Sequence, residues 1–553
     1  MKHIINFLTK YFEILKFNKF LKNRVKNIKS KNYILVEYNS YNVIHVLFFF
    51  LITSLQKKFN SSLIVINNQI LFNQDFDNFV NLLKWKIGSI MKIKYFLIYK
   101  TLGAKKFIIP HTNNEIQKKA LELFNNLKSK KILKDELRYL KIENILVGDL
   151  IIDGFYKFHK ADELNIDSNK FDKYLIKFIE LFYFWFFYTK KINIDAIIGV
   201  QAYYSSGIVF RILLEKNIQA FLISNGRINR ITKTQFYPNA AYLQYKELFS
   251  KLNEEQKLEA IKVAKKYIDN RLSGHTGKKI NEIATVASSF TNFYDDNKKV
   301  LNSNKKLKVL ISTHSLFDAY YCFGDNFFPD FQTWLDEVCK ISRETDYQWY
   351  IKDHPVQHQM KRVLAHELTS RFSKKLCEKY KNIIYIEPNT SHHQLIKEGI
   401  DVVLTVYGTI CWEYAYFNIP VLTATLNSPF NMYKFNIHSK SKEDYLNKLR
   451  NLSEIKINYS RDKNEIFEYY FTHYLFHNNN NLIPFYDNFL DEYKNWDFYY
   501  SEQFYNFFMK SCKINTIEDI EKSFDKFISS KDIYSNLNHS KIGVFKYLKD
   551  SMQ

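Results

Sequence analysis

The feature that most constrains the fold is an alternation of short apolar runs with longer segments of helical length. Between residues 33 and 66, the run YILVEY is followed by a long apolar segment and then by SLIVI. A strand, a crossover helix and a second strand in that order are typical of a parallel sheet. The same order returns where DAIIGV and QAFLIS flank SSGIVFRILLEKN. We therefore expect a doubly wound α/β domain in the first half of the chain.

A second alternation begins at residue 308, and its predicted strands are KVLIST, YQWYIK, IIYIE, DVVLTV and PVLTA. At 553 residues the chain is too long for one ordinary core, so two domains are expected on length alone. The sequence thus predicts two Rossmann-like doubly wound domains that face a cleft. We place the first at 1–290, the second at 300–455, and a helical C-terminal segment at 456–553 that packs back on the body.

Charge and cysteine content restrict the environment and the partners. Lys and Arg number 80 against 57 Asp and Glu, which gives a net charge of +23. The excess is spread along the chain without an Arg-rich stripe or an aromatic RNA-binding box, so nucleic acid is not expected as a partner. The five cysteines form no CxxC pair, which argues against a disulfide framework or a zinc site and fits a reducing cytoplasm.

Two features bear on membranes. Residues 1–26 combine apolar side chains at helical spacing with lysines and lack a clear signal-peptide core, which predicts a basic amphipathic helix. The apolar runs at 43–55 and 181–188 are shorter than the roughly 20 residues that span a bilayer. We therefore expect a cytoplasmic protein, with an anionic inner-membrane face as a candidate docking partner.

The loop that follows the predicted strand YQWYI carries a cation and an imidazole. Lys352 and His354 come directly after the strand, and Pro355 forces the chain out of the ladder. Ligands of open parallel sheets bind beyond the carboxyl ends of the strands. Lys352 and His354 would suit a diphosphate there, although a single loop histidine is more often structural.

Two further loops leave predicted strands of the second half. In the segment 401–424, Gly408 permits close backbone approach, Thr409 stands at a predicted helix start, and Glu413 follows one turn later. A carboxylate at that depth can accept hydrogen bonds from a ribose, or it can be an ordinary helix carboxylate. Ser391, in EPNTSHHQ, can cap a helix or offer its hydroxyl to a ligand, and plain capping is the simpler interpretation.

Taken together, these motifs resemble a known family. A strand followed by HP, a serine at a helix start, and GTICWEYAYFNIPVL, in that order, resemble the nucleotide-binding half of GT-B glycosyltransferases. The resemblance is to the bacterial capsule and surface polysaccharide group that includes Kdo and sialic acid transferases and glycerophosphate polymerases. It covers about residues 30–475 and is strongest over 308–424. Asp353 departs from the pattern, because a proline or small residue is common before HP, and it adds negative charge near the expected phosphate site.

The resemblance implies a role for each domain. His354 and the helix after Thr409 would hold the donor phosphate and Glu413 its ribose, while the first domain would hold the acceptor and the base. Candidates for the base are Glu37, Asp149 and Asp153, and candidate acceptor-side cations are Arg211, Arg227 and Arg230. No metal or cofactor is expected, because such sites use protein cations and helix dipoles, and the DxD-like pair Asp75 and Asp77 lies in a helix-like stretch.

Three functions are compatible with these residues. The first is a metal-independent glycosyltransferase that moves a sugar from a nucleotide-sugar donor to a capsule or lipopolysaccharide glycan. The second is a nucleotide-sugar epimerase of similar fold, which needs no acceptor. The third is a basic membrane or nucleic-acid scaffold without catalysis, for which a nucleotide site would have no use.

Overall fold

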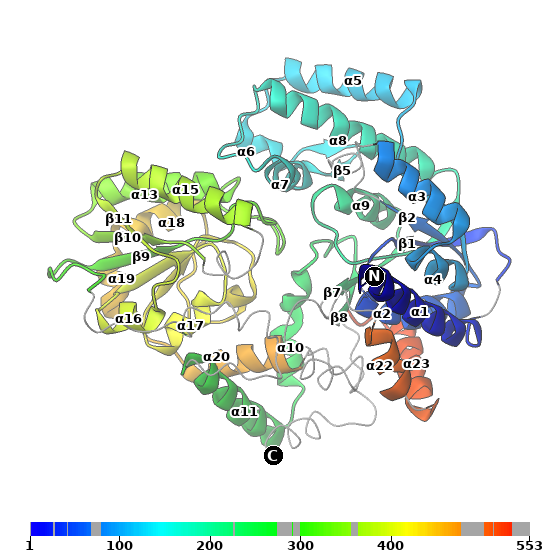
Figure 1. The fold of residues 1–553 in the computed structure, drawn as a ribbon. Coiled ribbons are helices and arrows are strands. Elements are labelled where there is room, and N and C mark those ends of the chain that lie inside the picture. Colours follow the sequence, from blue (N-terminus) through cyan, green and yellow to red (C-terminus); the bar gives the residue numbers. More distant parts are fainter. Residues whose placement is uncertain are drawn as a thin grey trace.

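The computed structural model (Figure 1) contains two large, mainly parallel sheets, each covered by helices. It describes residues 2–25, 28–40, 42–67, 79–224, 227–273, 290, 299–354, 363–476, 503–511 and 514–533. Pro355, Asp75 and Asp77 lie outside these residues, so what the sequence predicts for them stays a prediction.

The first sheet has the strand order β3-β2-β1-β6-β7-β8. Neighbouring strands are parallel except β7 and β8, which are antiparallel and which the sequence pattern did not predict as a pair. The strands are β1 (Asn32–Glu37), β2 (Ser62–Ile66), β3 (Ala104–Ile108), β6 (Asn193–Gly199), β7 (Gln219–Ser224) and β8 (Arg227–Ile231). The chain order reverses between β1 and β6, which makes this the topological switch point of the first sheet.

Both faces of this sheet are buried, as a doubly wound domain requires. Leu35 and Ile64 point into one apolar cluster, whereas Ile34 and Leu63 point into another, because successive side chains of a strand alternate between faces. The first cluster packs against α5 (Asn114–Ser129), α7 (Gly148–His159), α8 (Asn169–Tyr188) and α9 (Gly207–Glu215). The second packs against α1 (Lys2–Lys22), α2 (Asn42–Phe59), α4 (Tyr95–Thr101), α22 (Gln503–Ser511) and α23 (Ile514–Ser529).

Shorter elements complete the first half of the chain. They are α3 (Phe79–Met91), α6 (Lys134–Leu137), the two-residue strands β4 (Lys141–Ile142) and β5 (Ile145–Leu146), and the 3₁₀ turns η1 (Tyr204–Ser206) and η2 (Ala240–Gln244). After β8 the chain continues through α10 (Tyr245–Ser250) and the long helix α11 (Glu254–Leu272).

The second sheet has the order β11-β10-β9-β12-β13 and is parallel throughout. Its strands are β9 (Lys308–Ser312), β10 (Gln348–Lys352), β11 (Ile383–Ile386), β12 (Val402–Thr405) and β13 (Val421–Thr423). Its helices are α13 (Phe331–Ile341), α15 (Val363–Lys379), α16 (His392–Lys397), α17 (Ile410–Tyr416) and α18 (Lys442–Arg450), with 3₁₀ turns η4 (Ser342–Glu344) and η5 (Pro429–Met432). The prediction of two Rossmann-like doubly wound domains is confirmed.

The C-terminal part of the chain contacts both domains. The helix α20 (Lys463–Tyr470) lies against α11 and α17 and continues into the π-helical turn η6 (Phe471–Phe476), whereas α22 and α23 lie against α1 and α2 (Figure 1). The predicted boundaries at 290, 300 and 455 stay predictions. Residue 455 falls within α19 (Leu452–Asn458), so a division there would cut a helix.

Three apolar side chains in the described part of α1 are used for packing. Ile14, Phe17 and Leu21 are fully buried, and the ring of Phe17 stacks on Tyr505 of α22 with centroids 4.3 Å apart. This part of the predicted amphipathic helix therefore contacts protein, where we had expected it to contact lipid. In the described part of the chain, no helix combines the length and apolar character needed to cross a bilayer.

Candidate functional site

The candidate residues of the second domain come together at the carboxyl edge of its sheet. In a parallel sheet the loops after all strands emerge at the same edge, and ligands of such folds bind there. Lys352 ends β10, His354 follows it, and Ser391 immediately precedes α16. Gly408 and Thr409 form the turn between β12 and α17.

Lys352 is the buried cation of this edge. Its Nζ donates a hydrogen bond to the carbonyl oxygen of Pro388 at 2.8 Å, and its side chain is almost fully buried. Burial lowers the pKa of Lys352 to about 7, against the opposing effect of the Asp353 and Glu413 charges. Lys352 can therefore change its charge near neutral pH.

Asp353, the residue before His354, is held by hydroxyl groups of three neighbouring segments. Its carboxylate is buried and accepts hydrogen bonds from Thr313 Oγ1 at 2.8 Å, Ser373 Oγ at 2.6 Å and Tyr385 OH at 3.0 Å. Three hydroxyl donors thus stabilise the Asp353 charge in the interior. Asp353, which departs from the family pattern before HP, therefore links the end of β10 to Thr313, Ser373 and Tyr385.

A histidine that the sequence analysis overlooked lies between His354 and the glycine turn. His314 follows β9, the strand between β10 and β12, and its ring lies 6.3 Å from that of His354. Its Nε2 donates to the carbonyl oxygen of Tyr407. A Cβ on Gly408 would lie 2.9 Å from that Nε2, and Gly408 has φ of +139°. Position 408 therefore requires glycine for two reasons: its backbone has a positive φ, and a side chain there would collide with the imidazole of His314.

The signal that could have found His314 was present in the sequence. The string THS follows the strand KVLIS directly, as KDH follows YQWYI. Because β9 and β12 flank the switch point of the second sheet, a polar residue at the end of β9 was the better candidate for a ligand contact.

The two predicted helix starts are present without side-chain caps. Ser391 and Thr409 occupy the N-cap positions of α16 and α17, but neither side chain accepts a hydrogen bond from its helix. Plain capping by Ser391 was therefore the wrong interpretation. Its hydroxyl is buried and has no hydrogen-bond partner among the described residues, which leaves it free to meet a ligand.

Glu413 has a partner that the sequence could not show. Oε1 of Glu413 accepts hydrogen bonds from Arg271 Nε at 3.0 Å and Nη2 at 2.6 Å, and both side chains are buried. Arg271 comes from α11, which precedes the second domain in the chain. Glu413, which we expected to bind a ribose, therefore forms a buried ion pair with the guanidinium of Arg271.

His392 adds to the electrostatic character of the edge. Its Nδ1 hydrogen-bonds to Tyr414 OH at 2.9 Å, and its ring is buried. Burial holds the pKa of His392 well below its ordinary value, and the nearby charges of Lys352, His354, His393 and Arg271 lower it further. The His392 ring is therefore held in its neutral form beside Lys352 and the ion pair of Arg271 and Glu413.

Glu37 occupies the corresponding place in the first domain. It ends β1 at the switch point beside β6, and its Oε2 accepts a hydrogen bond from the backbone N–H of Val200 at 2.7 Å. Burial raises the pKa of Glu37 to about 7, although hydrogen bonds from Val200 and Gln201 lower it in part. A carboxyl group with this pKa can take up and release a proton at neutral pH.

Asp153 holds the two domains together. Its carboxylate accepts hydrogen bonds from the backbone N–H groups of Tyr320 at 3.0 Å and Tyr321 at 3.2 Å, in the loop between β9 and α13. Burial raises its pKa well above the ordinary value. The same loop is held by Tyr204 on Asp318 at 3.0 Å and by Tyr156 on Asp330 at 2.8 Å. These hydrogen bonds give Asp153 a structural role between the domains, and its predicted catalytic role stays a prediction.

Two of the three predicted acceptor-side cations, Arg211 and Arg230, form hydrogen bonds within the protein. Arg211 donates to both carboxylate oxygens of Asp149 and to the carbonyl oxygen of Leu146 at 2.8 Å, and it is buried. Arg230 donates to backbone carbonyls of Phe527 at 2.9 Å and Ser530 at 3.1 Å. The side chain of Arg227 lies outside the described residues. Arg211 and Arg230 therefore stabilise the first domain and its contact with the C-terminal helices.

Two histidines of the first domain, His45 and His159, lie in the interior or beside an aromatic ring. His45 is buried and contacts Tyr505 OH at 2.6 Å and the Asn39 carbonyl at 2.9 Å, and burial lowers its pKa to about 4. His159 lies 4.9 Å from the ring of Phe155. Among the described residues, no cluster of three or more His, Cys, Asp or Glu is arranged to hold a metal.

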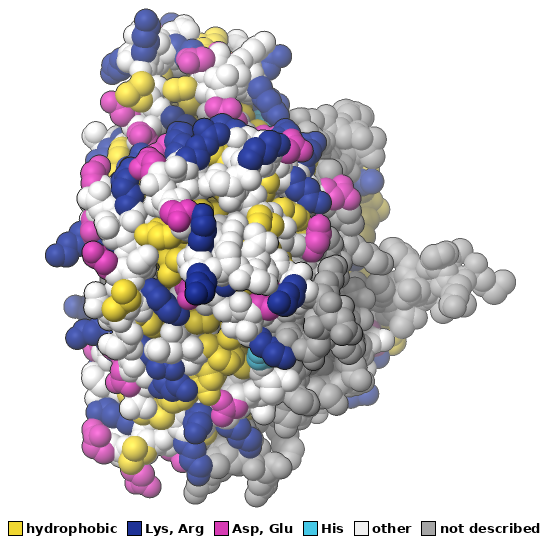
Figure 2. Space-filling model, turned by 90° about the vertical axis from the view of Figure 1, so that its left-hand side faces the viewer, with side chains coloured by type: hydrophobic (Ala, Val, Ile, Leu, Met, Phe, Trp, Pro, Cys, Tyr) yellow, Lys and Arg dark blue, Asp and Glu magenta, His cyan; other side chains and the backbone are white. Residues whose placement is uncertain are grey.

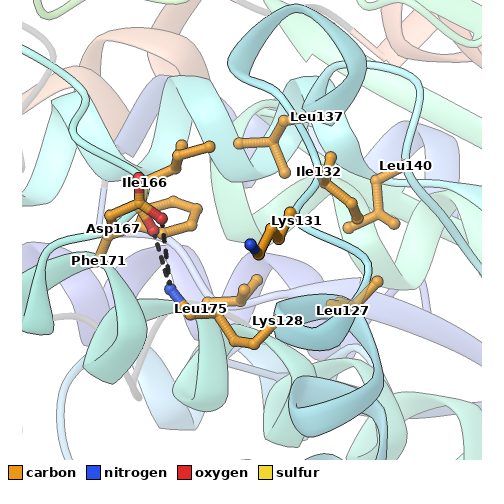
Figure 3. Close-up of a pocket in the computed structure, with 10 residues that line it drawn as sticks. All are labelled: Leu127, Lys128, Lys131, Ile132, Leu137, Leu140, Ile166, Asp167, Phe171 and Leu175. Carbon is orange, nitrogen blue, oxygen red and sulfur yellow. Dashed lines mark hydrogen bonds and ion pairs between the residues drawn. The ribbon is translucent and has the colours of Figure 1, made fainter.

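The hollow drawn in Figure 3 lies elsewhere in the first domain. None of the candidate residues lines it, and Lys128 at its margin pairs with Asp167 at 3.9 Å and Asp172 at 3.0 Å. Its lining residues are Leu127, Lys128, Lys131, Ile132, Leu137, Leu140, Ile166, Asp167, Phe171 and Leu175. Because this hollow lies within the first domain, it does not test the cleft predicted between the domains, which stays a prediction.

Two Rossmann-like domains, each with polar residues at the carboxyl edge of its sheet, define a GT-B-like architecture. No family model and no curated protein matches the chain. Solved structures do. A UDP-GlcNAc 2-epimerase from Methanocaldococcus jannaschii is 14% identical, with 78% of this chain and 94% of that chain covered and a TM-score of 0.19.

Two further structures show the same level of likeness. The Neisseria meningitidis UDP-GlcNAc 2-epimerase bound to UDP-GlcNAc is 12% identical, with 79% and 97% covered and a TM-score of 0.23. The wall teichoic acid polymerase TagF is 11% identical, with 89% and 96% covered and a TM-score of 0.19. Sequence identities and TM-scores this low do not allow an activity to be assigned to this chain from these structures. The fold assignment rests on the strand order of the two sheets.

Proposed function

We propose that this protein is a metal-independent glycosyltransferase, needing no cofactor, that moves a sugar from a nucleotide-sugar donor to a growing surface glycan at the cytoplasmic face of the membrane. The observation that carries the proposal is the group formed by Lys352, His354 and the unpartnered hydroxyl of Ser391 at the edge of the second sheet. A buried lysine whose charge is suppressed by burial gains a counter-ion when a phosphate binds. Such a place favours a donor that carries a diphosphate.

The chemistry divides between the two domains. An acceptor hydroxyl attacks the anomeric carbon, the bond from that carbon to the phosphate oxygen breaks, and the nucleotide leaves with the bonding electrons. Glu37 takes the hydroxyl proton, which its pKa of about 7 allows at neutral pH. Lys352 and His354 stabilise the negative charge that grows on the leaving phosphate. Neither step needs a metal ion.

The direct test is to incubate the protein with CMP-, UDP-, GDP- and CDP-linked donors, follow its melting temperature, and then analyse products with and without a glycan acceptor. Stabilisation by one nucleotide class and acceptor-dependent loss of donor support the proposal. A changed sugar in the absence of acceptor would indicate the epimerase. No response to any donor would favour a scaffold without catalysis.

His354→Ala is expected to weaken donor binding and transfer by about one to two decades, because a charge-assisted hydrogen bond to phosphate contributes roughly 1.5–3 kcal/mol. His354 is only half-buried, so the melting temperature should change little. Calorimetry of donor binding measures the first effect and thermal unfolding the second. His111→Ala, an exposed histidine of the first domain, is the matched control. Normal donor affinity in the His354 variant would remove His354 from the site.

Donor affinity is expected to fall as the pH rises through about 7. Lys352 carries its charge below this pKa and loses it above, so the attraction to phosphate is present at pH 6 and weakens towards pH 8.5. The measurement is the dissociation constant of the donor across this range. In Lys352→Met the affinity should be lower and this pH dependence lost. An equal slope in both proteins would show that another group is responsible.

A further inference from the structure

The surface helix α3 and the turn after it carry a concentration of exposed apolar side chains. Fourteen large apolar side chains of the described residues are exposed, and five of them lie between residues 83 and 93. Ile90 is 76% exposed and Met91 is 67% exposed. The five are Leu83, Ile87, Ile90, Met91 and Ile93. Clustering of this kind marks an interaction surface, whereas scattered apolar residues do not.

These side chains form a second face of α3, separate from its core face. Leu83, Ile87 and Ile90 follow the i, i+4, i+7 spacing of one helix face. The core face is formed by Trp85 and Gly88: Trp85 packs on Tyr38 and Phe96 with ring centroids 4.8 and 5.0 Å away. A Cβ on Gly88 would lie 2.5 Å from the ring of Phe96, so α3 sits close to α4 through that face. Core packing therefore does not explain the exposed face.

The charged residues of the segment that carries this face have one sign. Residues 79–106 contain seven lysines and neither Asp nor Glu. Lys84 and Lys86 lie on α3, and Lys92 and Lys94 lie in the turn to α4, each with φ of +56°. All four are exposed, and in the described part of the chain none of them forms an ion pair.

The flank formed by the second domain differs from this region. Figure 2 shows the flank formed by the second domain, where Lys and Arg side chains lie among Asp and Glu side chains. Figure 1 shows α3 along the outer flank of the first domain, opposite the second domain. The net charge of the whole chain therefore does not account for the uniform charge of residues 79–106.

We propose that α3 and the α3–α4 turn dock the protein on an anionic membrane surface, with Leu83, Ile87, Ile90 and Met91 in the lipid interface and Lys84, Lys86, Lys92 and Lys94 among the headgroups. An apolar ridge flanked by lysines is the composition that binds such interfaces. We place membrane docking on α3, where five exposed apolar side chains lie together, whereas in the described part of α1 Ile14, Phe17 and Leu21 are buried and only Phe12 and Leu15 are exposed. This surface is independent of the donor site, so either proposal can fail alone.

Co-sedimentation with phosphatidylcholine vesicles, with and without phosphatidylglycerol, tests the proposal on the full chain. The unaltered protein should bind the anionic vesicles and release them as salt is added. Ile90→Glu/Met91→Glu should lower the partition onto anionic vesicles by at least about tenfold. Lys84→Gln/Lys86→Gln/Lys92→Gln/Lys94→Gln should lower it by about a hundredfold or more, because each lysine near the surface contributes to the attraction.

The matched control is Leu258→Glu/Ile457→Glu, which makes the same change of charge at two exposed apolar positions on α11 and α19. It should retain vesicle binding. Circular dichroism confirms folding, and the lysine variant supplies the test if the Ile90 and Met91 variant does not fold. Three results overturn the proposal: no binding of the unaltered protein to anionic vesicles, equal loss in the α3 and control variants, or binding to a soluble polyanion such as heparin without binding to vesicles.

Discussion

Replacing Glu413 with alanine is expected to lower the free energy of unfolding by about 3–5 kcal/mol, because it leaves the guanidinium of Arg271 buried without its counter-ion. Two hydrogen bonds, at 3.0 and 2.6 Å, join Arg271 to Oε1 of Glu413, and both side chains are only a few per cent exposed. The nearby negative charge raises the pKa of Arg271, although burial alone would lower it. Urea denaturation followed by circular dichroism measures the loss.

A double-mutant cycle separates the ion pair from packing. Glu413→Ala and Arg271→Ala should each be strongly destabilising, while the double variant should lose less than the sum, since neither charge is then left unpaired. Glu443→Ala, at an exposed glutamate of α18, should change stability little. If Glu413→Ala unfolds like the unaltered protein but binds donor poorly, the ribose contact that the sequence suggested would be the better account.

Most of the fold could be predicted because buried parallel strands have a clear pattern. SLIVI and QAFLIS coincide with β2 and β7, and the five predicted strands of the second half match β9 to β13 within two residues at either end. Each is a short apolar run between polar segments, which is what burial on both faces demands. The edge strand β8 was missed because three of the five residues in its sequence, RINRI, are polar, and the strand depends on pairing with β7.

The candidate site was only partly predictable. The sequence shows which residues follow a strand, but it does not show which side chains they contact in the fold. Lys352, His354, Ser391 and Gly408 do lie at one edge of the sheet, as strand order requires. The partners of Glu413 and Asp353 lie far along the chain or in another element: Arg271 is 142 residues away and Ser373 is on α15. Pairings of this kind arise from packing, and no local pattern encodes them.

The same reason explains why two predicted catalytic carboxylates of the first domain have different surroundings. Asp153 and Glu37 both looked like loop or strand-end acids. In the structure, Asp153 accepts two backbone N–H groups from the second domain, whereas Glu37 accepts one from Val200 at the switch point of its own sheet. Only Glu37 stands where ligands of such sheets bind.

Glu37→Gln is expected to lower the rate of sugar transfer by about 10²–10⁴-fold, the contribution of a general base, while leaving the fold intact. Glutamine keeps the oxygen that accepts the hydrogen bond from Val200 but cannot take a proton from the acceptor. In the unaltered protein, the rate should rise with pH through about 7, because the ionised base forms above its pKa. Transfer assays across pH 5.5–8.5 measure both effects.

The stability of the unaltered protein should fall over the pH range in which the rate of transfer rises. The folded pKa of Glu37 is about 7 against an ordinary 4.5, so between these values the folded protein binds more protons than the unfolded chain. Stability is therefore lost as the pH rises through this window, by roughly 3 kcal/mol in total. Glu37→Gln avoids that loss and should be more stable than the unaltered protein at pH 8, with little difference at pH 4.5.

The combination of slower transfer and higher stability at pH 8 is what a buried base at the switch point requires. Glu115→Gln, at an exposed glutamate in the first turn of α5, should change neither quantity. If Glu37→Gln transfers sugar normally and gains stability, Glu37 is a buried acid without a role in the reaction. If it loses both activity and stability, the Val200 hydrogen bond needs the charged carboxylate, and the base has to be sought elsewhere in the first domain.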